Sequence, residues 1–315
     1  MSLTVFYASD IHGSDVLWRK FVNAGRFYEA DILVMGGDIA GKAVVPIVQR
    51  ESGYVAREIT GERVLGEQEL PAVERRIRDM GFYPYRTDPD ELERTSGDPE
   101  AVELLFADAM TRSLAAWLAL ADERLDGSGI SLYVMLGNDD LPALRETIGA
   151  SGVAVDPEER VVDLGEGFTM LSDGWSNPTP WSSPREMPEE DLERRLETLA
   201  ATVPDPARCV FNLHVPPART AIDQAPLLDA TRKPVVRGGA VQMGPAGSNA
   251  VRNVIERHQP AVALHGHIHE SRGVVKLGRT VCINPGSEYG EGVLHGALVS
   301  LDRRKGLAAY QLTSG

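Results

Sequence analysis

Residues 3–38, LTVFYASDIHGSDVLWRKFVNAGRFYEADILVMGGD, predict a strand, a helix and a second strand in succession. The run 3–8 is apolar and rich in Val, Phe and Tyr, which is typical of a buried strand. Ser14 or Asp15 is a good N-cap for the helix that follows. The second strand, 32–35, ends at Gly-Gly-Asp. This order predicts a parallel pair of strands and an α/β architecture.

The same alternation of strands and helices returns after residue 127. Short apolar runs predict further buried strands at 130–136, 161–164, 168–171, 209–213 and 262–264. A charged helix is expected after Pro188, a Pro- and Gly-rich loop up to Gly247, and another helix capped by Ser248. The tail, 273–301, indicates antiparallel strands.

Residues 43–127 depart from this rhythm. We expect a hairpin at 44–65, a short helix at 72–80, a loop rich in Pro, Asp, Thr and Gly at 84–99, and a long helix at 99–120. We therefore predict one domain over residues 1–315, with an inserted cap at about 43–127.

The chain of 315 residues carries 46 acidic and 32 basic side chains, a net charge of −14. This balance argues against general partners that are polyanionic, such as nucleic acid or an anionic membrane, because both require a basic footprint. Cys209 and Cys282 lie in apolar runs and are expected to be buried free thiols. The start, MSLTVFYASD, has no basic region, and no run reaches roughly 18 to 20 apolar residues, so we expect a cytoplasmic protein without a membrane span.

Polar signals follow five of the predicted strands directly. They are Asp10-Ile-His12, Gly37-Asp38, Gly137-Asn138-Asp139-Asp140, His214 and Gly266-His267-Ile-His269. Ligands of open α/β sheets bind outside the carboxyl ends of the strands, so these signals should converge. Carboxylates, imidazoles and amide oxygens suit borderline divalent metals such as Mn, Fe or Zn. Two metals about 3.5 to 4 Å apart can hold a deprotonated water for in-line attack on phosphorus.

With these motifs the sequence resembles the calcineurin-like metallophosphoesterases, in particular the Icc-related predicted phosphoesterases of bacteria and archaea. The resemblance extends from Asp10 to the turn 284–286, with 43–127 its weakest part. It implies a four-layer α/β sandwich, in which two packed mixed β-sheets are flanked by helices. It also implies two divalent metal ions, with Mn favoured. By motif position the first metal would be held by Asp10, His12 and His269, the second by Asn138, His214 and His267, and both by the bridging Asp38.

One position departs from the family pattern. The third motif is commonly Gly-Asn-His followed by an acidic residue, and its His contacts the scissile phosphate and is often assigned as the proton donor. Here Asp139 takes the His position and Asp140 the acidic one. Asp139 could act as a general acid if its pKa were raised, which a nearby phosphate would promote. If it stays ionised, it would repel phosphate and favour good leaving groups.

Other polar residues near the motifs have plainer interpretations. His265 is expected to be structural, and Asp140 is expected either to accept a hydrogen bond from a ligand or to cap a helix. Trp181 either touches substrate at the rim or packs an irregular loop. Tyr289 is a candidate substrate contact, and the stretch 244–248 could offer backbone N–H groups to a phosphate.

Together these features predict a dinuclear hydrolase of phosphate esters, with Asp38 and Asp139 acting in catalysis. We favour a phosphodiesterase on a small soluble, nucleotide-like substrate. Two alternatives stay open: a metal-binding scaffold that has lost the reaction, and a hydrolase of the pyrophosphate bond in a nucleotide-linked lipid precursor. The latter would need an apolar cap, and residues 43–127 are not apolar enough to favour it. The oligomeric state does not follow from the sequence.

Overall fold

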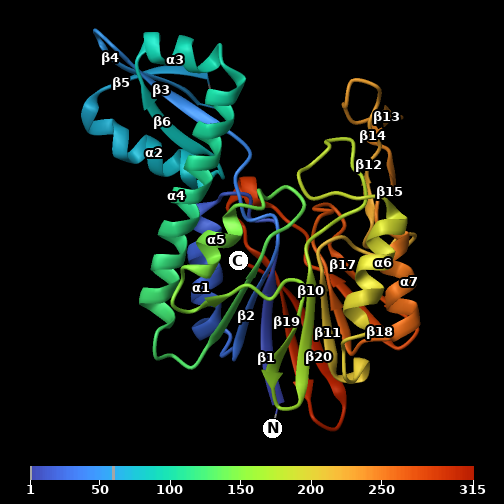
Figure 1. Ribbon diagram of the computed structural model, residues 1–315. Helices are drawn as coiled ribbons and strands as arrows, with labels where there is room; N and C mark the ends of the chain where they lie inside the picture. Colours follow the sequence, from blue (N-terminus) through green and yellow to red (C-terminus); the bar gives the residue numbers. More distant parts are fainter. Residues whose placement is uncertain (1, 59–60) are drawn as a thin grey trace.

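The computed structural model describes residues 2–58 and 61–315. These residues form two six-stranded sheets that pack face to face, with helices on both outer sides (Figure 1). A buried apolar layer between the sheets joins them and includes Val5, Tyr7, Phe168, Val210 and Val262. The predicted four-layer α/β sandwich is therefore confirmed.

The first sheet has the strand order β20-β19-β1-β2-β7-β8. Its strands are β1 (Ser2–Ala8), β2 (Ile32–Gly36), β7 (Ser131–Met135), β8 (Ala154–Val155), β19 (His295–Asp302) and β20 (Gly306–Ser314). β1 and β2 pair in parallel, as the opening residues predict, and β7 and β8 continue in the same direction. β19 pairs antiparallel with β1, which joins the tail of the chain to its start.

The second sheet has the order β17-β18-β16-β11-β10-β9. Its strands are β9 (Val161–Gly165), β10 (Phe168–Asp173), β11 (Cys209–Leu213), β16 (Val262–Leu264), β17 (Gly273–Leu277) and β18 (Thr280–Asn284). The four inner strands are parallel and the two edge strands antiparallel, so this sheet is mixed like the first. Cys209 and Cys282 are buried free thiols, as predicted.

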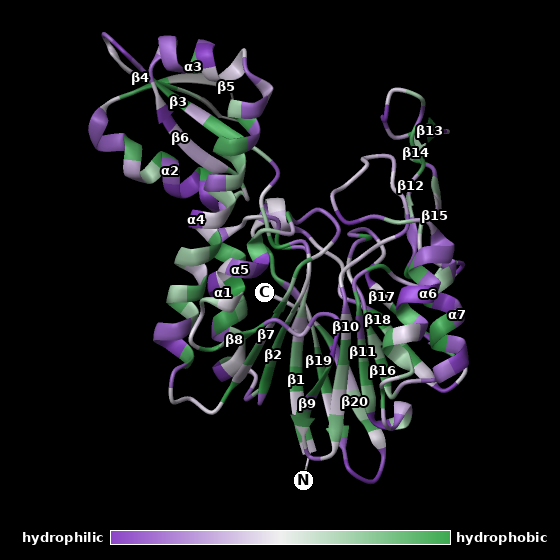
Figure 2. Ribbon diagram, viewed as in Figure 1, coloured by the Kyte–Doolittle hydropathy of each residue, from purple (hydrophilic) through white to green (hydrophobic). Residues whose placement is uncertain are grey.

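Helices cover the outer face of each sheet. On the first lie α1 (Asp15–Phe27), α4 (Pro99–Leu125) and α5 (Leu144–Gly149), and on the second α6 (Glu189–Ala200) and α7 (Asn249–His258). Trp18 of α1 stacks on Trp117 of α4, with ring centroids 5.3 Å apart. Ser248 caps α7 as expected, since its hydroxyl accepts the backbone N–H of Val251. Hydrophobic residues gather in the sheets, whereas the loops and outer helix faces are mostly hydrophilic (Figure 2).

The insertion forms a small sheet with the order β5-β4-β3-β6. Its elements are β3 (Val44–Arg50), β4 (Gly53–Glu58), β5 (Gly61–Leu65), the 3-10 turn η1 (Glu67–Glu69), α2 (Leu70–Asp79), β6 (Tyr83–Thr87) and α3 (Pro89–Ser96). A separate apolar cluster that includes Ile47, Leu65 and Val73 lies at its centre. The predicted loop at 84–99 is wrong, because this stretch holds both β6 and α3. That the insertion acts as a cap stays a prediction.

α4 differs from the sequence reading in another way. By length and composition alone it is apolar enough to cross a membrane, contrary to the expectation that no segment would be. Its buried residues nevertheless belong to the core beside α1, where Met110, Leu114 and Leu118 pack. About 28% of this apolar stretch is buried, and that part of α4 serves the packing of the first helical layer.

The expected loop before Gly247 contains short hairpins rather than irregular chain alone. They are built from β12 (Gln224–Pro226), β13 (Val236–Arg237), β14 (Ala240–Val241) and β15 (Met243–Pro245). Two further 3-10 turns, η2 (Pro206–Arg208) and η3 (Tyr289–Glu291), precede β11 and β19 respectively. The hairpins stand above the carboxyl ends of the second sheet (Figure 1).

Candidate metal centre

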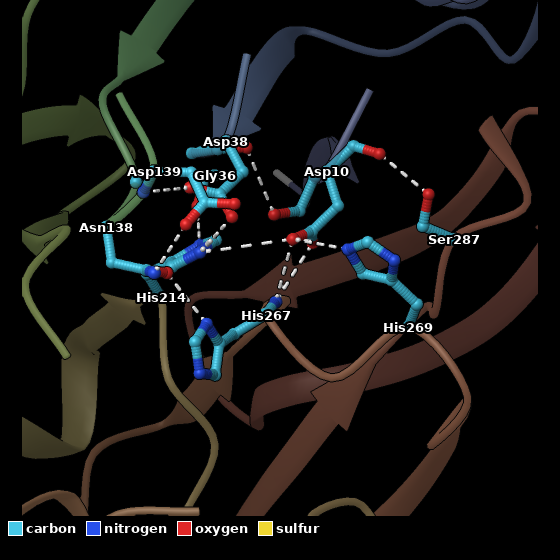
Figure 3. Close-up of polar contacts among 12 residues, drawn as sticks. Asp10, Gly36, Asp38, Asn138, Asp139, His214, His267, His269 and Ser287 are labelled. Carbon is cyan, nitrogen blue, oxygen red and sulfur yellow. Dashed lines mark hydrogen bonds and ion pairs between the residues drawn. The ribbon is translucent and has the colours of Figure 1, made fainter. Parts of the chain in front are cut away.

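The side chains predicted as ligands meet at one edge of the sandwich, where β1, β2, β7, β11 and β16 end (Figure 3). In the first group, ligand atoms of Asp10, His12 and His269 all lie within 4.8 Å of one another. His269 Nε2 is 3.0 Å from His12 Nε2 and 3.4 Å from Asp10 Oδ1. The predicted first ligand set is therefore assembled in space.

The second group consists of Asp38, His214 and His267, whose ligand atoms also lie within 4.8 Å of one another. Asn138 joins it, because its Oδ1 is 2.7 Å from His267 Nδ1. His214 Nδ1 lies 2.9 Å from the carbonyl oxygen of Gly36 and donates to it (Figure 3), so Nε2 is the ring nitrogen that faces Asp38. That Nε2 is buried and has no hydrogen-bond partner among the described residues.

Asp38 lies between the two groups. Its Oδ2 is 3.3 Å from His214 Nε2 and 3.9 Å from His12 Nε2. Its Oδ1 accepts the backbone N–H of Asp139 at 2.9 Å, which fixes the carboxylate plane. This is the place that a carboxylate shared by two metals requires.

The backbone at the site is strained. Asp10, His12, Asp38 and His267 have φ angles of 56°, 38°, 50° and 65°, in the left-handed region that residues other than glycine rarely adopt. Gly137 is required for a different reason, since a Cβ there would lie 2.1 Å from Asp38 Oδ1. The unfavourable φ angles in the turns after the strands thus cost some stability, and they orient these side chains toward the centre.

The carboxylates and imidazoles at the centre shift one another's pKa values. Burial lowers the pKa of His214, but Asp38 and Asp10 outweigh it and raise that pKa to about 10. Burial raises the pKa of Asp38, yet the charge of His214 brings it well below its ordinary value. Burial and the charge of His214 lower the pKa of His267 to about 4. The paired carboxylates therefore stabilise positive charge at their common centre, as a cation site does.

No protein-family model matches the chain. The uncharacterized protein MJ1162 of Methanocaldococcus jannaschii is 26% identical over 152 residues, which are 47% of this chain and only 61% of that protein. The structure of TT1561 from Thermus thermophilus aligns over 100% of this chain and 99% of that one, at 14% identity and a TM-score of 0.54. A novel archaeal phosphodiesterase aligns over 99% of this chain and 100% of that one, at 10% identity and a TM-score of 0.37.

The two-sheet sandwich and the Asp, His and Asn cluster at its strand ends occur together in this chain. The chain shares this fold with the structure of TT1561. The two-sheet sandwich is the fold implied by the resemblance of the motifs to the calcineurin-like metallophosphoesterases. What the solved phosphodiesterase hydrolyses is a property of that protein.

Asp139 stands where calcineurin-like phosphoesterases commonly carry His, and its partners are all donors. Ser183 Oγ donates to Asp139 Oδ1 at 2.5 Å and Asn138 Nδ2 donates to the same oxygen at 3.0 Å. Lys42 Nζ lies 3.2 Å from Asp139 Oδ2. Of the two readings of Asp139, these contacts favour the ionised carboxylate, since each donor hydrogen-bonds to it. The sequence reasoning missed Lys42 and Ser183, because neither belongs to a family motif.

Asp140 has neither of the roles expected for it. It is buried, and its carboxylate accepts the backbone N–H groups of Ile39, Ala40 and Gly137 at 3.1, 2.8 and 2.7 Å. Burial first, and the charge of Asp38 second, raise its pKa to about 7. Asp140 thus ties together the loops after β2 and β7 that carry Asp38 and Asn138. It neither caps a helix nor contacts a predicted ligand side chain.

Two aromatic residues beside the centre match their expectations only in part. His265 is buried, its Nδ1 lies 2.8 Å from the carbonyl oxygen of Leu213, and burial lowers its pKa to about 4, so it is structural as predicted. The Tyr289 ring lies 4.8 Å from the His12 ring and 5.8 Å from that of His269. Its role as a substrate contact stays a prediction.

The centre opens into a cavity of about 790 Å³. Asp38, Lys42, Asp139 and His269 lie on its wall at the metal-centre end. The remaining wall combines the stretches 178–181, 225–228 and 244–247 with polar residues that include Glu189, Arg232 and Asn249. The stretch 244–247 therefore faces the cavity, and so does Trp181, over whose ring Arg232 lies at 5.7 Å.

Proposed function

We propose that this chain is a dinuclear metal-dependent hydrolase of phosphate esters, acting by preference on a diester of a small soluble, nucleotide-like compound. The observation that carries the proposal is the pair of ligand groups on either side of Asp38. An α/β sandwich built only for stability would not collect buried carboxylates and imidazoles on strained turns at one strand edge.

The residues present fit a pair of divalent metals. His214 Nε2 is buried, lies 3.3 Å from Asp38 Oδ2 and has no hydrogen-bond partner in the described part of the chain. Such an atom is costly unless a cation or another donor occupies the space before it. Imidazole, carboxylate and amide donors in combination favour Mn, Fe or Zn, whereas an all-oxygen set would favour Mg or Ca. We favour Mn.

In this proposal Asp10, His12 and His269 hold the first metal. The second is held by Asn138, His214 and His267, and Asp38 is shared. When bound, the metals supply an activated water and neutralise charge on the phosphoryl oxygens. Gly36 keeps the His214 tautomer correct by accepting the Nδ1 proton.

Two features support a diester rather than a monoester. A cavity of about 790 Å³ whose wall is partly apolar is large enough for an organic group in addition to the phosphate. The ionised Asp139 at the cavity wall would repel the dianion of a monoester more strongly than the single charge of a diester. The net charge of −14 supports a small substrate over a nucleic acid.

The test is hydrolysis of bis-p-nitrophenyl phosphate and p-nitrophenyl phosphate with added Mn, beside the variant Asp38→Ala. We expect turnover by the parent, a preference for the diester, and loss of turnover in the variant. A preference for the monoester would contradict the diester assignment. No turnover of either ester by a parent that holds both metals would favour a metal-binding scaffold instead.

The variant Asp139→His separates a working enzyme from a weakened one. It restores the residue that the family commonly carries at this position. Because we assign Asp139 a working role, we expect lower turnover in this variant. A large gain would instead identify a decayed catalyst and support the scaffold alternative.

A further inference from the structure

Lys42 brings a positive charge to the edge of the metal centre. It lies in the loop after β2, four positions beyond Asp38, and its side chain is 43% exposed. Among the residues that the structure describes, the lysine and arginine side chains on the cavity wall are Lys42 and Arg232. Lys42 lies at the end of the cavity that also holds Asp38 and His269. A phosphate bound at the centre would therefore lie near this ammonium group.

Asp139 is held so that it can orient Lys42. Its Oδ1 accepts hydrogen bonds from Ser183 and Asn138, and its backbone N–H donates to Asp38. This leaves Oδ2 for the Lys42 ammonium, 3.2 Å away. The carboxylate is thus fixed by its neighbours, and it restricts where the end of a flexible lysine can lie.

Stability alone does not account for this pair. An ion pair with one partner 43% and the other 29% exposed contributes little to folding, on the order of 0 to 1 kcal/mol. It does, however, reduce the repulsion between the Asp139 carboxylate and an incoming phosphate. Lysine is a common phosphate-binding residue that acts as a point charge.

We propose that Lys42 contacts the scissile phosphoryl group through its ammonium, and that Asp139 is the positioning residue that holds the ammonium in place. This inference rests on the proposed function. The pair takes the position of the His that the family pattern commonly has, but supplies charge and no proton. It therefore matches esters whose leaving group departs without a proton, such as those with a good leaving group.

The first experiment compares Lys42→Ala and Lys42→Arg with Lys276→Ala, an exposed lysine on β17 that serves as the control. The readouts are metal content and the binding of inorganic phosphate to the Mn-loaded protein by calorimetry. Lys42→Ala should weaken phosphate binding about tenfold to a hundredfold, the usual range for a charged hydrogen bond. Lys42→Arg should retain most of the affinity, Lys276→Ala all of it, and every variant its metal.

The second experiment tests positioning with Asp139→Asn. In this variant the Lys42 ammonium keeps its charge but lacks the carboxylate that positions it. We therefore expect kcat for bis-p-nitrophenyl phosphate to fall, while phosphate affinity is kept or improved. The effect of Lys42→Ala on kcat should then be smaller in the Asp139→Asn background than in the parent. Loss of a metal ion from Asp139→Asn would show Asp139 to be a ligand and would overturn the positioning role.

The outcomes distinguish a failure of the Lys42 proposal from a failure of the proposed hydrolase function. Equal phosphate affinity in Lys42→Ala and Lys276→Ala refutes the phosphate contact, whatever the activity. A Mn-loaded parent that binds phosphate but hydrolyses neither ester refutes the proposed function alone. Additive effects of Lys42→Ala and Asp139→Asn on kcat would refute the coupling between the two residues.

Discussion

The buried ion pair between Arg185 and Glu158 offers a sharp test of how the metal centre is supported. The two residues are 3% and 2% exposed, and the Arg185 guanidinium hydrogen-bonds to the Glu158 carboxylate. Arg185 Nη1 also donates to the carbonyl oxygen of Gly137 at 3.0 Å, and its backbone N–H donates to that of Asn138 at 3.1 Å. The pair thus holds the turn that presents Asn138.

Arg185→Met would remove one partner and leave the Glu158 carboxylate buried without its counter-charge. Loss of one member of a buried pair typically lowers the free energy of unfolding by about 3 to 5 kcal/mol. Replacing both residues, as in Arg185→Met with Glu158→Leu, should recover most of this loss, because no unpaired charge remains. Mn affinity should stay low in both, since the bond to Gly137 is absent from each.

Urea denaturation at pH 7 measures the unfolding free energies, and calorimetry measures Mn binding. Arg194→Met is the matched control, because Arg194 pairs with Asp191 on the surface and is 77% exposed; it should change stability by less than about 1 kcal/mol. If Arg185→Met is as stable as this control, or if the double variant is less stable than Arg185→Met alone, the ion pair does not support the turn in this way.

Three further predictions follow from single positions. Gly137→Ala should weaken Mn binding, measured by calorimetry, at least about tenfold, since its Cβ would lie 2.1 Å from Asp38 Oδ1. Gly149→Ala is the control and should bind Mn normally, because a Cβ there would have nothing within 4 Å. Mn at about 100 times its dissociation constant should raise the free energy of unfolding by about 2.7 kcal/mol in thermal denaturation, and less in His214→Ala; an equal gain in both would contradict the assigned ligand. Burial raises the pKa of Asp173 to about 6 despite Arg195, from an ordinary unfolded value near 3.9. A raised acid pKa favours the folded state at low pH, so the parent should lose up to about 3 kcal/mol relative to Asp173→Asn as pH rises from about 4 to about 6. A pH-independent difference between these two proteins in urea denaturation would contradict the assignment.

Most of the sandwich could be predicted from the sequence, because its strands are short continuous apolar runs bounded by polar turns. The run before Asp10 and the run before Asp38 are each buried between two layers, so they carry the pattern of parallel strands. Their carboxyl ends then bring the polar motifs to one edge, and that convergence followed from topology alone.

The insertion could be predicted less well, because the Pro, Asp, Thr and Gly content of 84–99 indicated a loop where the structure has a strand and a helix. Pro84 lies in β6, where it pairs opposite Val45. β6 is an edge strand, and proline is tolerated at an edge. Asp88 caps α3 and Pro89 is its first residue, a start signal that the abundance of turn-forming residues concealed.

The environment of Asp139 lay beyond the sequence for another reason. Lys42 and Ser183 are far from Asp139 along the chain, and neither residue type at such a spacing indicates a partner. Their contact with Asp139 depends on how the loops after β2 and β10 fold over the strand ends. Tertiary packing, rather than any local pattern, decides which residue neutralises this carboxylate.

The central claim is that Asp38 joins two metal sites. Metal content after equilibration with Mn and removal of free metal, measured by mass spectrometry on the parent and on Asp38→Ala, tests it most directly. We expect two Mn ions for each parent chain and at most one for the variant. A parent that holds a single ion at saturation, or a variant that keeps both, would contradict it.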